Sequence, residues 1–441
     1  MTPAGSWPVE ECPNQYSYPA SKTFIPDRVK FVRRAIVEAC EQLVARLVAG
    51  LSAAPRRLAG NVVGFSSARE SRPTQRPNSV IGDRGEPILS AMPLQPPLHH
   101  RPMKVAVLGP VAWRTPPRHY GPWELVTSLL TEGLVARGLD VTLFATLDSR
   151  TGASLDGICP NGYAEDPGLD GRVWEAMHIA YAFERSGEFD LVHSHLDWLP
   201  LAFSAHCRAP LLTTVHGFSG RGILPAYARA RSSYVSISDA DRAPGLDYVA
   251  TIHHGIDLTE LPYAPGGGTG LVAFGRIHPD KGTAEAIEIA RRANLPLTIC
   301  GIVQDESYFI ERVRPHIDGD RVRYLGSVGP ADRAEILGSS LALLHPISFD
   351  EPFGLSVVEA MACGTPVVAF RRGSMPEVVD DGVTGFLVHT VEEAVRAVRV
   401  VGSLDRAACR KHVEERFGVD RMVDEYVRVY RDIASTELSP W

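Results

Sequence analysis

The stretch that decides the fold is Phe349–Phe370, "FDEPFGLSVVEAMACGTPVVAF". Within it, "GLSVVEAMACG" has the apolar spacing of a helix and ends in Gly364, which is typical of a helix stop. "TPVVAF" follows as a short apolar strand of the kind buried in parallel sheets. Glu351 precedes the helix and Glu359 lies inside it, so a segment that otherwise predicts buried helix and strand carries two carboxylates.

The same alternation of strand and helix extends in both directions. From Met103, "KVAVLG" predicts a strand, Pro122 and Gly138 bracket a helix, and "DVTLFAT" predicts the next strand, which together form a βαβ unit. A Pro- and Gly-rich break at Glu260–Gly270 is typical of a linker. Further strands are expected in "FDLVHSH", "PLLTTVHG", "SYVSIS", "GLVAFGR", "PLTICG", "RVRYLG", "LALLHP" and "GFLV".

These patterns predict an α/β chain with two Rossmann-like domains, each built on a parallel sheet and facing a central cleft. Ligands bind beyond the carboxyl ends of such strands, so the loops there are the ones to examine. The predicted ranges are 1–102 for an N-terminal extension, 103–262 for the first domain, 263–420 for the second, and 421–441 for a final amphipathic helix.

The first 102 residues are net basic, whereas the remainder is net acidic. Residues 27–51 place apolar side chains at helical spacing beside a basic face, which predicts one amphipathic helix. The stretch after it is rich in Pro, Arg and Ser, as in a disordered linker. The helix would suit a peripheral contact with an anionic membrane surface or a partner. The alternative is an accessory extension ahead of a start at Met103.

Composition argues against several classes of protein. Hydrophobic residues make up 44%, enough for a sizeable core, and the formal net charge of −7 gives no reason to expect nucleic acid as a partner. The seven cysteines are odd in number and widely spaced, which argues against a disulfide framework or zinc site and favours a cytoplasmic location. No run of about 18 uncharged apolar residues occurs, so no transmembrane segment is expected.

Two further patterns bear on cofactors and metals. The loop after the first strand lacks G-x-G-x-x-G, so a dinucleotide cofactor is unsupported. Asp318-Gly319-Asp320 imitates a D-x-D metal motif, but its place between a helix and a strand favours a polar turn. We therefore expect neither a metal nor a cofactor.

Two cations follow one strand of the second domain. Arg276 and Lys281 lie just past "GLVAF", where they would either converge on a diphosphate or form a solvated turn. Gly354, Leu355 and Ser356 begin the helix of the opening stretch, where unpaired N–H groups and the helix dipole favour a phosphate.

Three other positions each have a functional and a structural explanation. Ser356 and Glu359 match S-x-x-E, a helix capping box, although a carboxylate there would equally suit the vicinal hydroxyls of a ribose. His216 follows a buried strand, where a histidine is more often structural than functional. Gly121 and Pro122 open a helix and form either an anion site or a tight turn.

Taken together, these motifs resemble a known family. "GRIHPDKG" followed by "EPFGLSVVEAMACGTPVVA", with the spacing E-x7-E, resembles the retaining glycosyltransferases of family 4, which have the GT-B fold. "VHG", "ISDADR" and "PEVVDDGVTGFLV" occur in the order that this family shows. The resemblance runs from Met103 to the final helix, which in this fold crosses back onto the first domain.

The resemblance implies a metal-independent enzyme that moves a hexose-type sugar from a nucleotide-diphosphate sugar to a hydroxyl acceptor. The acceptor would be a small molecule, a glycan or a lipid-linked compound. The residues it assigns to donor binding are Arg276, Lys281, Glu351, Phe353, Gly354, Leu355, Ser356 and Glu359. Those it assigns to catalysis are His216, Arg276, Lys281 and Glu351. The acceptor-side candidates are Arg114, Tyr120, Gly121 and Glu124.

The chain departs from the family pattern at two places. Pro122 stands where the family often has a second glycine, and it removes an N–H that an acceptor phosphate would need. His254-Gly255 replaces the common Asn-Gly. Two other functions on this fold stay open, a non-catalytic sugar-nucleotide sensor and a sugar-nucleotide epimerase. The donor base, the sugar, the acceptor and the oligomeric state are not determined by these motifs.

Overall fold

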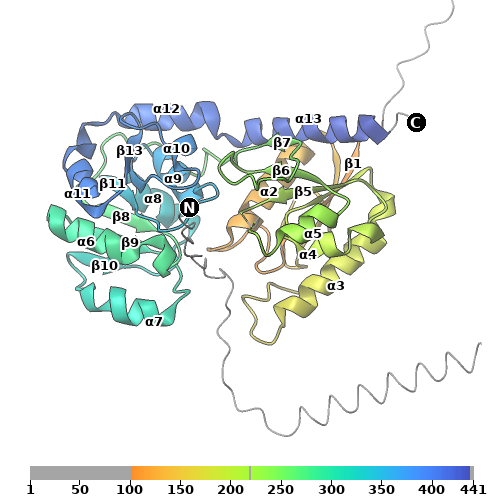
Figure 1. The fold of residues 1–441 in the computed structure, drawn as a ribbon, viewed down its shortest axis with the longest axis horizontal. Helices are drawn as coiled ribbons and strands as arrows, with labels where there is room; N and C mark the ends of the chain where they lie inside the picture. The colour runs from red at the N-terminus through yellow and green to blue at the C-terminus, as the bar shows by residue number, and fades with distance from the viewer. Residues whose placement is uncertain (1–100, 218–219, 438–441) are drawn as a thin grey trace, which may run out of the picture. The chain divides into compact units, whose positions relative to one another are not determined.

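The computed structural model describes residues 101–217 and 220–437. The amphipathic helix and the linker expected in the extension lie outside these residues. The strands of the described part form two sheets, and every pair of neighbouring strands is parallel (Figure 1). Among the described residues, no helix combines the length and the apolar character needed to cross a bilayer.

The first lobe is the sheet in the order β3-β2-β1-β4-β5-β6-β7 with the helices that connect its strands. Its strands are β1 Lys104–Leu108, β2 Asp140–Phe144, β3 Ser154–Asp156, β4 Leu191–Ser194, β5 Leu211–Val215, β6 Ser233–Ser236 and β7 Ala250–Thr251. Its helices are α2 Pro122–Ala136, α3 Gly171–Glu184, α4 Leu199–Ala202 and α5 Leu224–Arg229.

The second lobe is the sheet in the order β10-β9-β8-β11-β12-β13 with its own helices. Its strands are β8 Leu271–Phe274, β9 Leu297–Cys300, β10 Val322–Tyr324, β11 Ala342–His345, β12 Val367–Phe370 and β13 Gly385–Val388. Its helices are α6 Thr283–Ala293, α7 Glu306–Tyr308, α8 Pro330–Gly338, α9 Leu355–Ala362, α10 Met375–Val378, α11 Val391–Val400 and α12 Arg406–Arg416.

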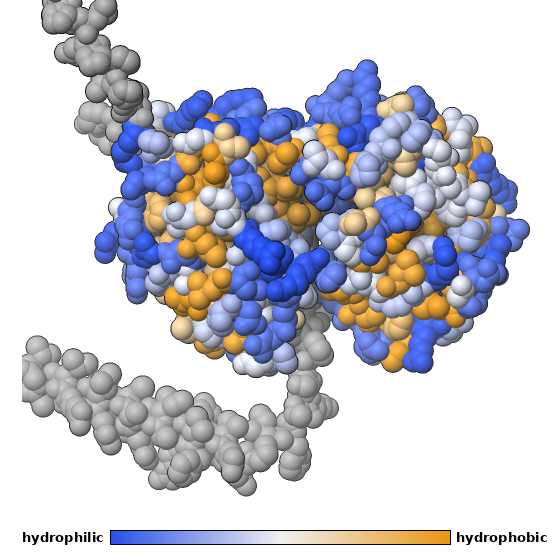
Figure 2. Space-filling model, turned by 180° about the vertical axis from the view of Figure 1, so that it is seen from behind, coloured by the Kyte–Doolittle hydropathy of each residue, from blue (hydrophilic) through white to orange (hydrophobic). Residues whose placement is uncertain are grey.

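The central strands of each sheet are buried on both faces, as is usual for parallel sheets covered by helices. Along β1, Val105 and Val107 belong to one core cluster, whereas Ala106 and Leu108 belong to another, because successive side chains point to opposite faces. Helices α2 and α13 contribute to the first cluster and α3 to the second. Figure 2 shows hydrophilic and hydrophobic residues intermixed over one face of the molecule.

The last helix, α13 Val419–Glu437, packs against the first lobe (Figure 1). Its Tyr430 hydroxyl lies 2.7 Å from Nδ1 of His193 in β4, and Nε2 of the same ring lies 2.8 Å from the Thr214 hydroxyl. Tyr426 extends this chain by a hydrogen bond of 2.8 Å to Thr214. Burial lowers the pKa of His193 well below its usual value, so the ring is neutral and has one donor and one acceptor to satisfy.

The sequence predicted these strands well, with two exceptions. Every strand expected from an apolar run is present. Short strands β3 and β7 were not expected, because neither carries an apolar run and both are only partly buried. The division predicted at residues 262–263 falls in the connection between β7 and β8 and stays a prediction.

Tyr430→Phe should destabilise the protein, because it leaves a buried nitrogen of His193 without a partner. We expect a loss of about 1–3 kcal/mol in the free energy of unfolding, measured by urea denaturation. Tyr263→Phe is the control, since that tyrosine is exposed. Equal unfolding midpoints for the two variants would contradict the anchoring of α13 by this hydrogen bond.

Candidate functional site

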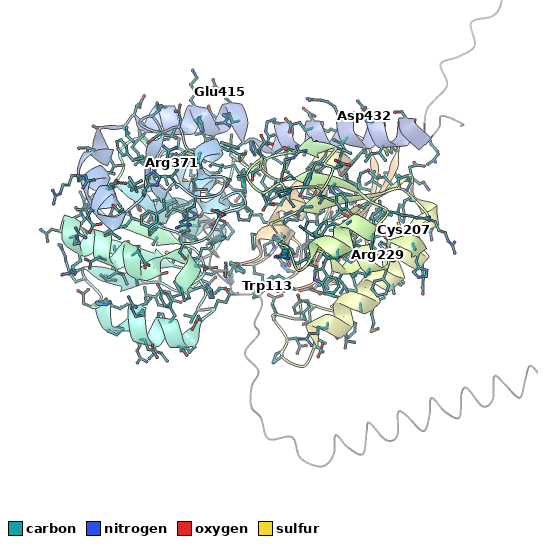
Figure 3. All side chains as sticks on the ribbon, viewed as in Figure 1. Trp113, Cys207, Arg229, Arg371, Glu415 and Asp432 are labelled. Atoms are coloured by element: carbon teal, nitrogen blue, oxygen red, sulfur yellow. The ribbon has the colours of Figure 1, made fainter. Side chains whose placement is uncertain are left out.

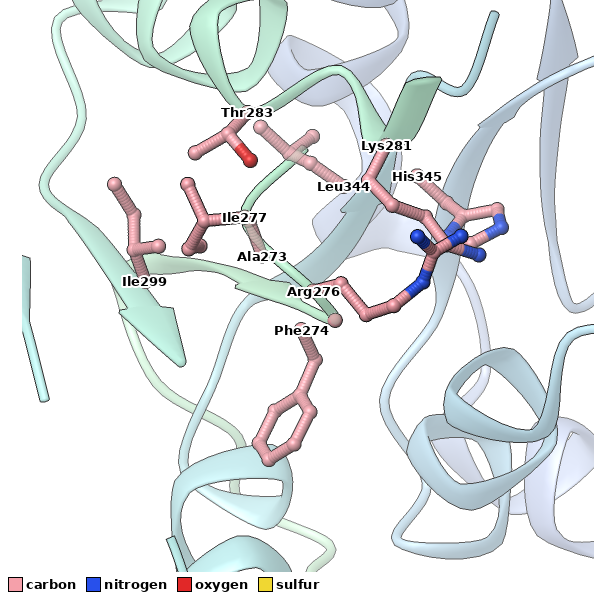
Figure 4. A pocket seen from close by; sticks show the side chains of 10 residues that line it. Ala273, Phe274, Arg276, Ile277, Lys281, Thr283, Ile299, Leu344 and His345 are labelled. Carbon is pink, nitrogen blue, oxygen red and sulfur yellow. The ribbon is translucent and has the colours of Figure 1, made fainter. Parts of the chain in front are cut away.

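A small pocket of the second lobe lies beyond the carboxyl ends of β8 and β11. Arg276, Lys281 and His345 line it together with apolar residues of the strands. Figure 4 shows the nitrogen-bearing ends of these three side chains lying close to one another. The parallel sheet therefore gathers cationic and polar groups from separate loops at one edge.

A partly buried ion pair occupies this edge. Lys281 Nζ lies 2.7 Å from Glu351 Oε2, and His345 Nε2 lies 3.3 Å from the same oxygen. Burial by itself would raise the pKa of the Glu351 carboxyl, but the charge of Lys281 and the contact with His345 hold it well below its usual value. Glu351 is therefore an anion at neutral pH, and the Lys281 ammonium also lies 4.6 Å from the centre of the Phe349 ring.

Arg276 is held by neighbours of its own. Its guanidinium lies 3.2 Å from the Asp280 carboxylate and contacts the side-chain oxygen of Gln304. The two cations that the sequence places five residues apart thus reach one pocket, and each is already paired with a carboxylate. A diphosphate that enters would meet a fixed pair of cations rather than two mobile side chains.

The helix of the opening stretch is α9, and Gly354 is its N-cap with a φ of 91°. A side chain at Gly354 would place its Cβ 2.6 Å from Met375 Cε, so the position favours glycine in both backbone and space. Ser374 Oγ donates to the carbonyl of Phe353 at 2.9 Å and fixes the preceding loop. In the described part of the chain, no acceptor binds the N–H of Leu355 or Ser356.

The capping-box explanation of Glu359 is wrong. Ser356 lies inside α9 rather than at its N-cap, so it has no cap to form. The Glu359 carboxylate instead accepts a hydrogen bond from Arg333 NH1 in α8, at 2.8 Å. Glu359 is 6% exposed, and a buried carboxylate needs such a partner.

His216 lies in a row of buried histidines in the first lobe. Its Nε2 is 3.2 Å from His195 Nδ1, and its Nδ1 is 3.3 Å from His254 Nε2. Trp123 stacks on the ring with centroids 5.2 Å apart. Burial lowers the pKa of His216 well below its usual value, so the ring is neutral. Both nitrogens face other histidines here, and a sugar hydroxyl would have to replace one of these contacts.

The acceptor-side candidates lie in the loop of residues 114–121, which we call the acceptor-side loop, and at the start of α2. Trp113, labelled in Figure 3, precedes this loop, and its backbone N–H donates to Glu124 Oε1 at 3.2 Å. Burial raises the pKa of Glu124 to about 8, so the carboxyl is largely protonated at neutral pH. Gly121 is the N-cap of α2 and has a φ of 149°.

Two other members of this loop, Tyr120 and Arg114, are partly buried. Burial raises the pKa of Tyr120, while the charge of Arg276 from the second lobe acts in the opposite direction. Arg114 Nε is buried, and no residue in the described ranges accepts its hydrogen.

The sequence reasoning missed three residues of the site. Arg333, His345 and Gln304 lie beside predicted residues, yet none belongs to a motif that marked it out. Only the position of His345 at a strand end gave a signal. The Asp318 turn, by contrast, is as expected, since its carboxylate accepts the N–H groups of Asp320, Arg321 and Val322.

Family models match both lobes of the chain. Residues 124–260 match "Glycosyltransferase Family 4", and residues 265–412 match "Glycosyl transferases group 1". A D-inositol 3-phosphate glycosyltransferase of Saccharomonospora viridis is 30% identical over 319 residues, which cover 57% of this chain and 72% of that protein. A glycogen synthase of Mycobacterium tuberculosis is 27% identical over 358 residues, covering 68% and 86%.

Solved structures agree on the fold. The avilamycin A biosynthesis glycosyltransferase AviGT4 superposes with a TM-score of 0.60 at 24% identity, covering 76% of this chain and 98% of that one. Anabaena Alr3699/HepE, solved with UDP and glucose, gives 0.61 at 19% identity, covering 74% and 99%. The chain belongs to the GT-B glycosyltransferases, with a family 4 domain followed by a group 1 domain.

The raised pKa of Glu124 predicts a pH-dependent stability. Between about 4.5 and about 8 the folded protein keeps a proton on Glu124 that the unfolded chain releases, so this group's contribution to stability falls as pH rises. Glu124→Gln, which is neutral at every pH, should therefore gain melting temperature relative to the wild type between pH 5 and pH 8. A difference between the two melting temperatures that stays constant over this range would show that Glu124 is ionised throughout.

Proposed function

We propose that this glycosyltransferase transfers a hexose-type sugar from a nucleotide-diphosphate sugar to a hydroxyl acceptor, with retention of the anomeric configuration and without a metal. The observation that carries the proposal is the partly buried Lys281–Glu351 pair beside Arg276 at the edge of the second sheet. It puts an anion suited to sugar hydroxyls next to cations suited to phosphates.

The charges at the edge of the second sheet define a donor site. Arg276 offers a planar fork and Lys281 a point charge to the diphosphate, and the open N–H groups at the start of α9 add partial positive charge. Glu351 would accept hydrogen bonds from the donor sugar, since it stays ionised. Glu359 would bind the ribose with the carboxylate oxygen that Arg333 does not use.

In the proposed reaction, the cations and the N–H groups at the start of α9 act in a single step. The bond between the anomeric carbon and the leaving phosphate oxygen breaks, and a bond from the acceptor oxygen forms on the same face of the sugar. The leaving phosphate oxygen takes the acceptor's proton, so no enzyme nucleophile is required. Cations and helix N–H groups fixed beforehand stabilise the negative charge that develops on the diphosphate.

The acceptor-side loop favours an uncharged acceptor. Pro122 removes a backbone N–H at the start of α2, so a phosphate bound there would lose a hydrogen-bond donor. The relative from Saccharomonospora viridis is named for a phosphorylated acceptor, and we propose that this chain differs from it there. A cytoplasmic location stays a prediction.

Thermal-shift screening against UDP-, GDP- and ADP-sugars tests the donor site. A true donor at about 100 times its Kd should add roughly 2.7 kcal/mol of stability, visible as a rise in melting temperature. Product analysis with that donor then tests the stereochemistry. A product of inverted configuration would refute retention, and the absence of a shift with any activated sugar would refute the donor site.

Lys281→Ala and Arg276→Ala should each slow turnover of the donor by roughly 10²–10³-fold, because each removes a charge that stabilises the leaving group. Release of the nucleoside diphosphate is the measurement, and thermal melts confirm that the variants fold. Arg314→Ala, an exposed arginine of the same lobe, is the control and should match the wild type. Near-normal turnover in either site variant would contradict the role assigned to it.

A further inference from the structure

Arg333 joins three groups that belong to two different parts of the site. NH1 donates to Glu359 Oε1 at 2.8 Å, and NH2 donates to the carbonyl of His119 at 3.1 Å. The guanidinium also lies 5.5 Å from the centre of the Phe274 ring at the end of β8. One planar cation therefore touches the proposed ribose carboxylate and the backbone of the acceptor-side loop.

One oxygen of the Glu359 carboxylate has no hydrogen-bond partner among the described residues. Arg333 uses one oxygen of Glu359, and no described residue hydrogen-bonds to the other, so arginine and ribose fit the carboxylate at the same time. The Nε of Arg333 is buried and has no acceptor among the described residues. The side chain is thus held by the carboxylate on one side and by the loop on the other, and its Nε–H donor remains unpaired among the described residues.

The loop meets the start of α8 at a second place. A Cβ on Gly329, the residue before α8, would lie 3.7 Å from Nδ1 of His119. His119 therefore lies against the segment that carries Arg333, and its carbonyl hydrogen bond does not stand alone.

We propose that Arg333 couples occupancy of the nucleoside site to the order of the acceptor-side loop. This inference rests on the proposed function, since it takes Glu359 as the group that binds the ribose. A ribose that engages Glu359 fixes the carboxylate, the carboxylate fixes the guanidinium, and the guanidinium holds the carbonyl of His119. Ordering the Arg333 side chain costs conformational entropy, and this cost is met when the donor binds. The acceptor-side loop can then become ordered against Arg333 without that cost, so donor binding favours an ordered acceptor site. Arg333 acts through Glu359 and the loop, so it is a positioning residue.

Hydrogen exchange of residues 114–121 measures this coupling directly. We use the wild type with UDP, GDP or ADP, whichever binds in calorimetry, and follow the same peptide with and without the nucleotide. Exchange in the wild type should slow by about fivefold or more on nucleotide binding, a factor at the low end of typical couplings between sites.

Two variants distinguish a loss of the coupling from a general loss of protein stability. Arg333→Lys keeps a charge beside Glu359 but lacks the fork that reaches two acceptors, so it should bind nucleotide within about tenfold of the wild type while the exchange response disappears. Glu335→Gln, an exposed position on the same helix, is the matched control and should keep the full response.

Two outcomes would contradict the proposal, each in a different way, and one outcome would support it. An exchange response in Arg333→Lys equal to that of the wild type would overturn the coupling and leave the donor site standing. A wild type that binds none of the three nucleotides would overturn the proposed function and the coupling with it. Loss of the response in Arg333→Lys, with binding retained and the control unchanged, supports the proposal.

Discussion

A carboxylate largely removed from water is costly unless a cation lies beside it, and the second lobe holds two such carboxylates, one buried and one partly buried. Glu351 has Lys281, and Glu359 has Arg333. The partners are 70 and 26 residues apart in the chain, so each pair exists only when the sheet has formed. The charge of Lys281 keeps Glu351 ionised at neutral pH, and Arg333 gives the buried carboxylate of Glu359 a charged hydrogen-bond partner.

The parallel sheets make this arrangement available. Because all neighbouring strands run the same way, the loops that leave β8 and β11 emerge at one edge and bring Lys281, His345 and Glu351 together. The first lobe is held by contacts with two helices that come later in the chain, α13 and α10. Its long helix α13 is tied to His193 through Tyr430, and Glu377 of α10 accepts the N–H groups of Asp239 and Ala240 in the loop after β6.

Local patterns were reliable where one physical rule dominated. Apolar runs predicted the strands, because a strand covered on both faces has little choice of residue. Gly354 was predicted to lie at the beginning of the helix, and the structure places it at the N-cap of α9 with a positive φ. The capping box failed because a capping motif requires its serine to lie at the N-cap, and Gly354 holds that position. The edge strands β3 and β7 escaped notice because partial burial leaves no apolar signature.

The sequence by itself determined the succession of strands and helices, the residues that end them, and the ionisable groups that follow the strands of the second lobe. Only the tertiary structure decided how those groups pair. In the folded chain Glu359 accepts a hydrogen bond from Arg333 rather than capping its own helix, and His216 lies between His195 and His254. Burial also leaves Glu124 largely protonated at neutral pH. The reason is that strand and helix patterns depend on neighbours along the chain, whereas charge state and hydrogen bonding depend on neighbours in space. His193 and Tyr430, for example, lie 237 residues apart in the chain.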